Sequence, residues 1–319
     1  MIVLWRTTTR CNYACGFCAY DRRVGGTRNE VAATEVVRFG ALLVDWMRAR
    51  GRRVMLSWLG GEPLLWRPIW EMSERLANAG LAISATTNGS TLHHDAVRAA
   101  VIATFDELTV SIDGPEAIHD RLRGRAGAWS RVRDGVRALV SARGTAPLRL
   151  RANVVLMRET FAHFADLCAA LADWGIDEVT FNQLGGRDRP AFFPAQRLGL
   201  TEVAALEAML PDLRRRLATR GVMLCGNDRY LDRLRASASG AALPVEDCGP
   251  GRAFLFIDEQ GIVSPCGFSG NAYGVPITAL RSVSDLDALP ARFAAARAQR
   301  RLATCDDCPS TQAFAKFEA

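Results

Sequence analysis

Apolar and polar positions follow two alternating spacings through the first two thirds of the chain. Short apolar runs of strand length are each followed by a longer segment in which apolar residues recur every three or four positions, as on one face of a helix. Six strands are predicted, at residues 2–7, 53–58, 82–86, 107–112, 148–156 and 178–183. Helices are predicted between and after them, at residues 29–51, 68–80, 93–103, 128–143, 160–174 and 201–220.

Six strand–helix alternations predict a parallel α/β sheet that closes partly or wholly into a barrel. In such folds the functional residues gather where the strands end. The unusual polar and glycine-rich motifs of this chain fall at those positions. They are the cysteine loop at 9–18, Gly60-Gly61-Glu62-Pro63, Thr87-Asn88-Gly89, Ser111 with Asp113, Asn153, and Leu184-Gly185-Gly186. This coincidence favours an enzyme over a structural protein.

The pattern changes after about residue 221. A short strand at 222–225 is predicted first, then a hairpin of strands 253–258 and 261–264, and a helix near 283–300. Small residues dominate 236–242, and we place a domain boundary near Gly240. The predicted domains are therefore 1–240 and 241–319.

Composition narrows the class of protein. Of the 319 residues, 49% are hydrophobic and 23% charged, which is ordinary for a soluble globular enzyme. No apolar run reaches the ~20 residues that span a bilayer, and no signal peptide is recognisable, so no membrane association is expected. The net charge of +6 comes from arginines scattered over amphipathic helices, which argues against a nucleic-acid partner. Nine cysteines without a secretion signal indicate a reducing cytoplasm and metal or catalytic roles.

Cys11, Cys15 and Cys18 have C-x3-C-x2-C spacing directly after the first strand. Three thiolates can hold three irons of a [4Fe–4S] cluster and leave the fourth iron open to a non-protein ligand. A structural zinc site usually takes four protein ligands, and disulfide pairing would leave one cysteine over.

With Phe17 before the last cysteine, this loop resembles the signature of the radical S-adenosylmethionine (radical SAM) superfamily. The resemblance implies that the open iron binds the amine and carboxylate of SAM, whose reductive cleavage gives a 5′-deoxyadenosyl radical. Gly60, Gly61 and Glu62 resemble the family's GGEP loop, which receives the SAM ammonium. Glycines permit close backbone approach and a carboxylate pairs with an amine; without the family, the same residues would be a tight turn with a solvated acid.

The stretch 111–124 resembles the SIDGP…HDRxRG region of the same family. The resemblance implies that Ser111 and Asp113 line the SAM site and that Arg123 holds the SAM carboxylate. The alternative is that the arginines cap a helix. Asn88, Asn153 and Leu184 are further candidate SAM contacts, although Asn88 before a glycine is also typical of a turn.

Cys248, Cys266, Cys305 and Cys308 form a second set. Four thiolates suit either zinc or an iron–sulfur cluster. Downstream of radical SAM motifs, this set resembles a twitch domain, the short form of the SPASM domain, with one fully ligated auxiliary [4Fe–4S] cluster. The resemblance thus implies a partial (β/α)6 TIM-type barrel followed by a small C-terminal twitch-like domain, two [4Fe–4S] clusters and SAM.

Two cysteines remain. Cys168 lies on the apolar face of the 160–174 helix, as expected for core packing. Cys225 ends a short strand that we expect near the barrel mouth, where it is either a buried small hydrophobe or a hydrogen-atom donor, as in radical SAM epimerases.

The resemblance implies an external one-electron reductant of the flavodoxin or ferredoxin type and abstraction of hydrogen from an unactivated C–H. We expect a small-molecule substrate, a sugar, aminoglycoside or cyclitol, because the cluster loop begins at Cys11 without a preceding peptide-recognition domain. Epimerisation with Cys225 as donor is the first hypothesis and oxidation of a secondary alcohol the second. A ribosomal-peptide epimerase is a further alternative, whereas a non-enzymatic iron–sulfur or zinc module would need neither GGEP nor SIDGP.

Overall fold

One ten-stranded sheet runs through the whole protein. The computed structural model describes residues 1–18, 29–185, 191–314 and 316–317. Strands β1 to β7 are parallel and lie in sequence order, and β8, β9 and β10 continue the sheet on the other side of β1. The strand bounds are β1 Ile2–Thr8, β2 Met55–Gly60, β3 Ala82–Thr87, β4 Glu107–Ser111, β5 Arg149–Leu156, β6 Glu178–Gln183, β7 Met223–Leu224, β8 Phe254–Ile257, β9 Ile262–Ser264 and β10 Val275–Pro276.

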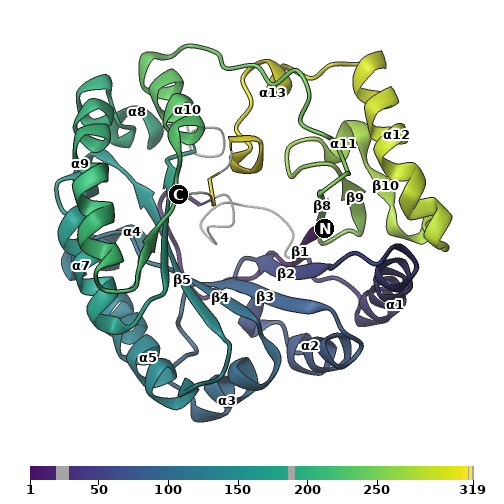
Figure 1. Ribbon diagram of the computed structural model, residues 1–319, viewed down its shortest axis with the longest axis horizontal. Helices are drawn as coiled ribbons and strands as arrows, with labels where there is room; N and C mark the ends of the chain where they lie inside the picture. The colour runs from purple at the N-terminus through teal and green to yellow at the C-terminus, as the bar shows by residue number, and fades with distance from the viewer. Residues whose placement is uncertain (19–28, 186–190, 315, 318–319) are drawn as a thin grey trace.

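The sheet is curved, and the main helices surround its outer side (Figure 1). This arrangement leaves the inner faces of the strands around a central space, and it covers the outer apolar faces. The helix bounds are α1 Ala33–Arg50, α2 Ile69–Asn78, α3 Asp95–Thr104, α4 Glu116–Arg123, α5 Ala128–Arg143, α6 Arg158–Phe161, α7 Phe164–Trp174, α8 Phe193–Gln196, α9 Leu200–Ala218, α10 Asp228–Ser239, α11 Gly270–Tyr273, α12 Val283–Gln299 and α13 Ala303–Asp306. Short 3₁₀ helices span η1 Pro63–Leu65, η2 Ile277–Ala279 and η3 Thr311–Phe314.

All six predicted parallel strands are present, and two of the predicted helices differ from the structure. The first helix begins at Ala33 rather than residue 29, because the backbone of Asn29 and Val31 hydrogen-bonds with Thr9 and Thr7 beside β1. The predicted helix 160–174 is two helices, α6 and α7, since the chain turns at 162–163.

Two longer helices, α4 and α10, were not predicted, and neither were the four-residue helices α8, α11 and α13. The HDRLR stretch forms α4, and α10 begins where the Asn227 side chain accepts a hydrogen bond from the Tyr230 backbone at 3.3 Å. The first turns of α10 are polar, so the pattern of apolar positions did not predict this helix. The small residues at which we placed the domain boundary belong partly to α10. The helix ends at Ser239, and Gly240 follows it.

The predicted hairpin of β8 and β9 is present and antiparallel. Its first strand also pairs with β1 in parallel, from Ile2 opposite Phe254 to Trp5 opposite Ile257. Strand β1 therefore lies between β2 and β8, and the last quarter of the chain joins the same sheet as the first.

Aromatic side chains fill the core around β1 and β2. Trp5 is fully buried, with its ring centroid 5.8 Å from Phe39 and 6.1 Å from Trp58. The indole nitrogen of Trp58 donates to the Ser73 hydroxyl at 2.8 Å, which satisfies its one polar atom. These contacts fix β1 and β2, from which the cysteine and glycine loops emerge. Among the described helices, none combines the length and apolar character needed to cross a membrane.

Candidate active site

The predicted motifs meet at the carboxyl edge of the parallel strands. Cys11, Cys15 and Cys18 follow β1, and the thiols of all three act electrostatically on one another. No three metal-ligating side chains among the described residues converge closely enough for a single ion. Three soft thiol donors fit an iron–sulfur cluster with one open iron better than a structural zinc, which takes four protein ligands.

The end of α4 holds the cysteine loop in place. The backbone nitrogens of Ala14 and Gly16 donate to the carbonyls of Arg123 and Leu122, each at 3.1 Å. Gly124 follows with a φ of 61°, and a Cβ on it would lie 2.6 Å from the Ala14 carbonyl oxygen. The final glycine of the HDRLRG stretch is therefore required by the close approach of the cysteine loop.

Gly60 and Gly61 pack against the backbone that leads into the cysteine loop. A Cβ on Gly60 would lie 2.4 Å from the Thr8 carbonyl oxygen, and one on Gly61 would lie 2.2 Å from that of Arg10. The backbone nitrogen of Gly61 donates to Thr8 at 2.7 Å. The sequence attributed these glycines to ligand approach, whereas their first constraint is contact between two loops of the protein.

Glu62 is fully buried beside these loops. Its carboxyl group accepts hydrogen bonds from the Thr87 hydroxyl at 2.6 Å and from the backbone nitrogens of Asn88 and Leu64 at 2.7 and 3.2 Å. Burial raises the pKa of Glu62 to about 7, although the three hydrogen bonds lower it. A cation placed here would restore the ionised form, so the group suits a ligand ammonium.

Asp113 and Arg123 form a buried ion pair. Nε of Arg123 donates to Asp113 at 2.8 Å, and the other Asp113 oxygen accepts from the Val155 backbone at 3.0 Å. His119 accepts from the Asp113 backbone nitrogen at 3.2 Å, and burial lowers the pKa of His119 well below its usual range. Arg123 therefore lies at the candidate SAM site with its guanidinium bound to Asp113. It is also the last residue of α4, as expected from the alternative in which the arginines cap a helix.

Asn88 faces the first cysteine. Its amide nitrogen donates to Asn12 at 2.9 Å and lies 3.7 Å from the Cys11 sulfur. Asn12 in turn donates to the Ser90 hydroxyl at 2.9 Å. Asn12 and Ser90 were not predicted as site residues. Their only signal in the sequence was their position, Asn12 in the cysteine loop and Ser90 directly after Thr87-Asn88-Gly89.

The other predicted SAM contacts come from β4, β5 and the segment after β6. Ser111 and Asn153 are opposite one another on β4 and β5, and the Asn153 side chain faces residues of the next strand. Its oxygen accepts from Thr180 at 3.1 Å and Asn182 at 3.0 Å. Leu184 packs in an apolar cluster that includes Leu122 and Met157, and Gly186 of the same motif lies outside the described residues.

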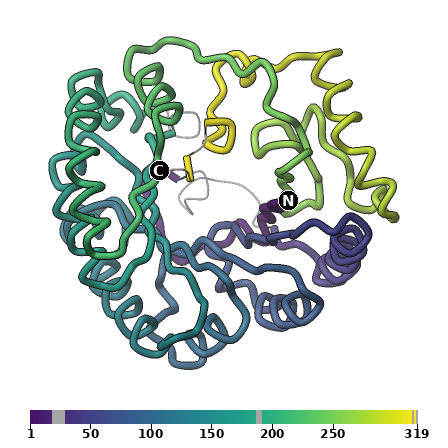
Figure 2. The backbone as a smooth tube through the Cα atoms, viewed as in Figure 1, coloured from purple at the N-terminus to yellow at the C-terminus, as the bar shows by residue number. Residues whose placement is uncertain are grey.

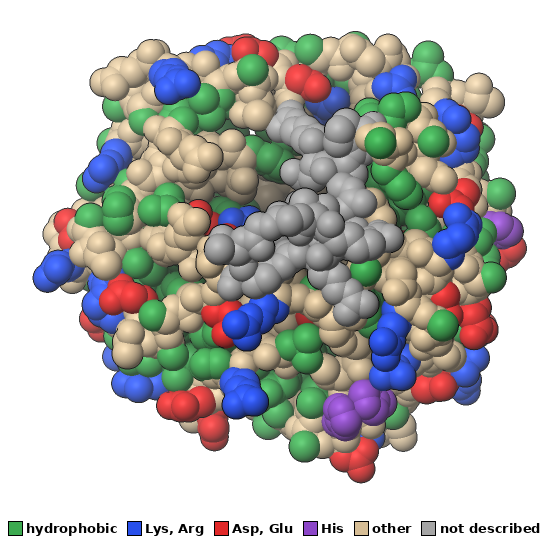
Figure 3. Space-filling view, turned by 180° about the vertical axis from the view of Figure 1, so that it is seen from behind, with side chains coloured by type: hydrophobic (Ala, Val, Ile, Leu, Met, Phe, Trp, Pro, Cys, Tyr) green, Lys and Arg blue, Asp and Glu red, His purple; other side chains and the backbone are tan. Residues whose placement is uncertain are grey.

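A cavity of about 490 Å³ occupies the centre of the curved sheet. The space-filling view from behind shows a hollow above the middle of the molecule (Figure 3). Hydroxyl and amide groups form most of the polar wall: Ser57, Ser84, Thr86, Thr109, Asn153, Thr180 and Asn182.

Cys225 lies beside the first half of β6, not at the carboxyl edge where the sequence placed it. Its backbone nitrogen donates to Val179 at 2.9 Å, because β7 pairs only with the start of β6. The side chain is fully buried and is not among the residues that line the central cavity. Burial raises the pKa of the Cys225 thiol to about 11, so it carries its proton at neutral pH.

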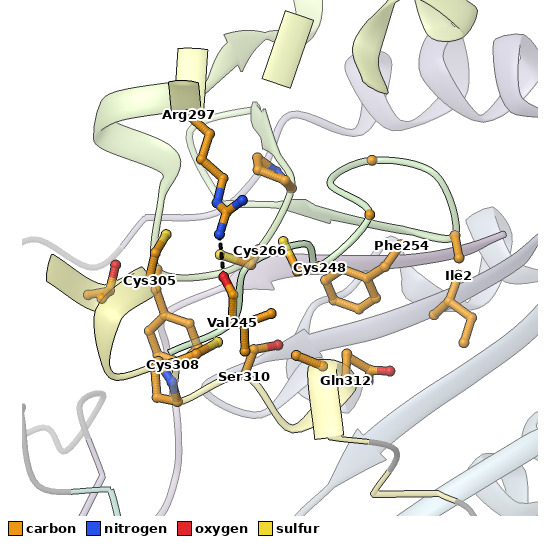
Figure 4. Close-up of a pocket in the computed structure, with 18 residues that line it drawn as sticks. Ile2, Val245, Cys248, Phe254, Cys266, Arg297, Cys305, Cys308, Ser310 and Gln312 are labelled. Atoms are coloured by element: carbon orange, nitrogen blue, oxygen red, sulfur yellow. Dashed lines mark hydrogen bonds between the residues drawn. The ribbon is translucent and has the colours of Figure 1, made fainter. Parts of the chain in front are cut away.

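The four cysteines of the second set come together around one cavity of about 190 Å³ (Figure 4). Cys248 precedes β8, Cys266 follows β9, and Cys305 and Cys308 belong to α13 and the turn after it. Burial raises the pKa of the Cys248 thiol, and the nearby Arg297 opposes that effect. Arg297 itself donates to the backbone carbonyls of Val245 and Glu246. Four soft donors around one space fit a fully ligated iron–sulfur cluster.

Comparison with known proteins supports the same family. The sequence profile of the Radical SAM superfamily matches residues 5–171, slightly more than half of the chain. An AdoMet-dependent heme synthase of Methanosarcina barkeri is 32% identical over 139 residues, which cover 43% of this chain and 38% of that protein. The chain therefore spans less than half the length of the curated relatives it matches first.

Two further likenesses cover more of the chain. The mycofactocin maturase MftC of Mycolicibacterium smegmatis is 23% identical over 83% of this chain and 64% of its own length. The crystal structure of Streptococcus suis SuiB bound to S-adenosylmethionine superposes with a TM-score of 0.70 over 97% of this chain and 72% of that one, at 15% identity. The last likeness extends the shared fold to nearly all of the chain.

Proposed function

Because this chain belongs to the radical SAM superfamily, we propose that Cys11, Cys15 and Cys18 hold a [4Fe–4S] cluster and that SAM binds against it. When bound and reduced, this pair supplies a 5′-deoxyadenosyl radical that takes a hydrogen atom from an unactivated substrate C–H. The observation that carries the proposal is the contact network between the three thiols, Glu62 and Asn88 at one edge of the sheet. Glu62 receives the SAM ammonium, Gly60 and Gly61 shape its loop, and Arg123 orients the SAM carboxylate from its pairing with Asp113.

Further parts of the proposal concern the architecture. The curved sheet with its outer helices is a partial (β/α)6 barrel over 1–240, and residues 241–319 form a twitch-like unit. In that unit Cys248, Cys266, Cys305 and Cys308 ligate a second [4Fe–4S] cluster. Support comes from the four thiols around one cavity. The enzyme receives electrons from a flavodoxin- or ferredoxin-type donor in a reducing cytoplasm. Asn88, Ser111, Asn153 and Leu184 complete the SAM site.

We propose that the substrate is a small molecule in the central cavity and that the reaction is an epimerisation. The thiol of Cys225 breaks its S–H bond and gives the hydrogen atom to the opposite face of the substrate carbon. The thiyl group left behind takes back one electron, from the second cluster or the external reductant, and one proton from water. The protonated state of Cys225 supports this role.

Cys225 is fully buried and does not line the central cavity, which favours a second candidate, oxidation of a secondary alcohol. There the substrate radical would lose one proton to water and one electron, and a cluster held by Cys248, Cys266, Cys305 and Cys308 would supply the electron acceptor. A ribosomal-peptide substrate is a third candidate, since SuiB is known in complex with its precursor peptide SuiA.

One experiment separates these reactions. Cys225→Ala and the core variant Cys168→Ala are assayed with candidate sugars and cyclitols in deuterated buffer. Epimerisation predicts one solvent deuterium at the inverted carbon, lost in Cys225→Ala and retained in Cys168→Ala. A ketone product made equally by both variants would establish the dehydrogenase instead. Loss of SAM cleavage in Cys15→Ala tests the radical chemistry itself.

A further inference from the structure

The single lysine of the chain lies inside the central cavity. Lys316 is 6% exposed, and its ammonium nitrogen donates to the Asn153 side-chain oxygen at 2.7 Å. It follows η3, and this part of the chain lies near the middle of the molecule (Figure 2). No role was predicted for Lys316, which stood out only as the single lysine.

Contacts on both sides fix this segment. Arg229 of α10 donates to the Ala313 carbonyl at 3.2 Å. The Phe317 ring lies 5.0 Å from the Lys316 nitrogen and 4.9 Å from the guanidinium carbon of Arg151. Aromatic contact with two cations holds Lys316 at the cavity wall.

The other charges of the cavity neutralise one another. Arg151 is hydrogen-bonded to both Glu107 and Glu178, and Glu178 also pairs with Arg149 at 3.2 Å. Arg151 thus pairs with two buried glutamates, and the more exposed Arg149 also pairs with one of them.

Lys316 is left without such a partner. It has no carboxylate partner within the part of the chain that the structure describes. The groups that act on it electrostatically are Arg151, which disfavours its charge, and the Cys225 thiol, which is neutral at pH 7. Burial lowers the pKa of Lys316 to about 7, the direction expected for an uncompensated buried amine. An anion beside it would remove that penalty.

Asn153 is suited to release the lysine to a ligand. Its oxygen has two lone pairs yet accepts from Thr180, Asn182 and Lys316. If Lys316 turned to a ligand, this oxygen would remain satisfied. An ammonium has three N–H donors, of which Asn153 uses one.

We propose that the central cavity binds its substrate through an anionic group, a carboxylate or a phosphate, that pairs with Lys316. The hydroxyl and amide groups of the wall then bind the substrate's hydroxyls, so the substrate is a small hydroxylated anion such as a sugar acid or sugar phosphate. This inference rests on the proposed function and narrows its substrate class, because a polycationic aminoglycoside would meet Lys316 with charge of the same sign.

The test relies on Lys316 being the single lysine of the sequence, so that any lysine signal belongs to it. Protein grown on ¹³Cε-labelled lysine gives one lysine signal in its carbon spectrum, and its titration is followed alone and with inorganic phosphate, glucuronate, glucose or glucosamine. We expect a midpoint near pH 7 in the free protein, and a rise of at least one pH unit with phosphate or glucuronate. Glucose and glucosamine leave the midpoint unchanged, and whichever anion shifts it identifies the recognised group.

Calorimetric titration of variants with the same probes gives the second readout. Lys316→Gln weakens binding of the anion at least tenfold, Lys316→Arg keeps it, and Arg215→Gln, which removes one exposed surface charge, leaves it unchanged. A free-protein midpoint near the ordinary lysine value of about 10.4, no shift with either anion, or an equal shift with glucosamine overturns the proposal.

Cleavage of SAM by the reconstituted enzyme is measured in parallel. Anion binding without SAM cleavage contradicts the proposed function and leaves the anion site standing. SAM cleavage without anion binding contradicts only the anion site.

Discussion

Arg123 joins Asp113 to Cys15: its Nε donates to the Asp113 carboxylate at 2.8 Å, and its Nη1 lies 3.9 Å from the Cys15 sulfur. One guanidinium therefore connects the end of β4 to the cysteine loop after β1. The Asp113 side chain is fully buried, and Arg123 is its ion-pair partner. The pair links the stability of the sheet edge to the geometry of the candidate cluster site.

Arg123→Ala is expected to destabilise the protein by about 3–5 kcal/mol, because it leaves a buried carboxylate without its cation. The free energy of unfolding of cluster-free protein, measured in urea, checks this value. Arg121→Ala is the matched control, since Arg121 pairs with Glu159 at the surface and such pairs contribute about 0–1 kcal/mol. Equal effects of the two substitutions would contradict the role of the buried pair.

Gly61→Ala is expected to abolish SAM binding, because the new Cβ would lie 2.2 Å from the Arg10 carbonyl oxygen beside Cys11. The two loops would have to separate. Gly270→Ala on α11 is the control, as the nearest atom to a Cβ at that position is Oγ of Ser264 at 3.9 Å, an ordinary contact distance. Equilibrium binding of SAM to both reconstituted variants measures the difference, and tight binding by Gly61→Ala would refute the packing argument.

The stability of the cluster-free protein is expected to depend on pH through Glu62. Its pKa is about 7 in the folded protein against an ordinary 4.5. As pH rises between these values, the unfolded chain loses the proton while the folded protein keeps it. The free energy of unfolding therefore falls by about 1.4 kcal/mol per pH unit in that window.

Urea unfolding at several pH values checks this slope. Glu62→Gln should remove the contribution, because the amide does not titrate. Glu74→Gln, at an exposed position on α2, should leave the slope as it is. An unchanged slope in Glu62→Gln would assign the pH dependence to other groups.

Replacement of one cysteine of the second set should halve the iron content. Reconstituted wild-type protein should contain about eight irons per chain, and Cys305→Ala about four. Cys168→Ala should keep all of them, since Cys168 is buried in the apolar core. Iron, sulfide and zinc analysis decides the result, and one zinc per chain in the wild type would contradict the second cluster.

The alternating pattern was sufficient to predict the parallel strands, because β1 to β6 each contain several apolar residues and each is followed by a helix. It was not sufficient to predict α10, whose first turns are polar and whose last turn looks like a linker. The pattern also could not predict the pairing of β8 with β1, because residues as distant in sequence as Ile2 and Phe254 leave no local signal of their contact.

The candidate site was predicted unevenly. Glu62 and Asp113 were found because short motifs follow their strands directly. Their partners were not assigned: the bond from Thr87 to Glu62 depends on two loops meeting across the sheet edge. Lys316 carried no motif at all, and only the path of the chain after η3 brings it to Asn153.

The position of β1 between β2 and β8 has a consequence for biosynthesis. The nascent chain emerges from its N-terminus, so β1 must wait for some 250 further residues before its second neighbour exists. Until then it presents one open edge with the apolar residues Ile2, Val3 and Leu4, a surface prone to pairing with other chains. Contacts between such distant segments also form slowly. Heterologous expression at low temperature, with chaperones that mask this edge, should therefore raise the yield of native protein more than stronger promoters would.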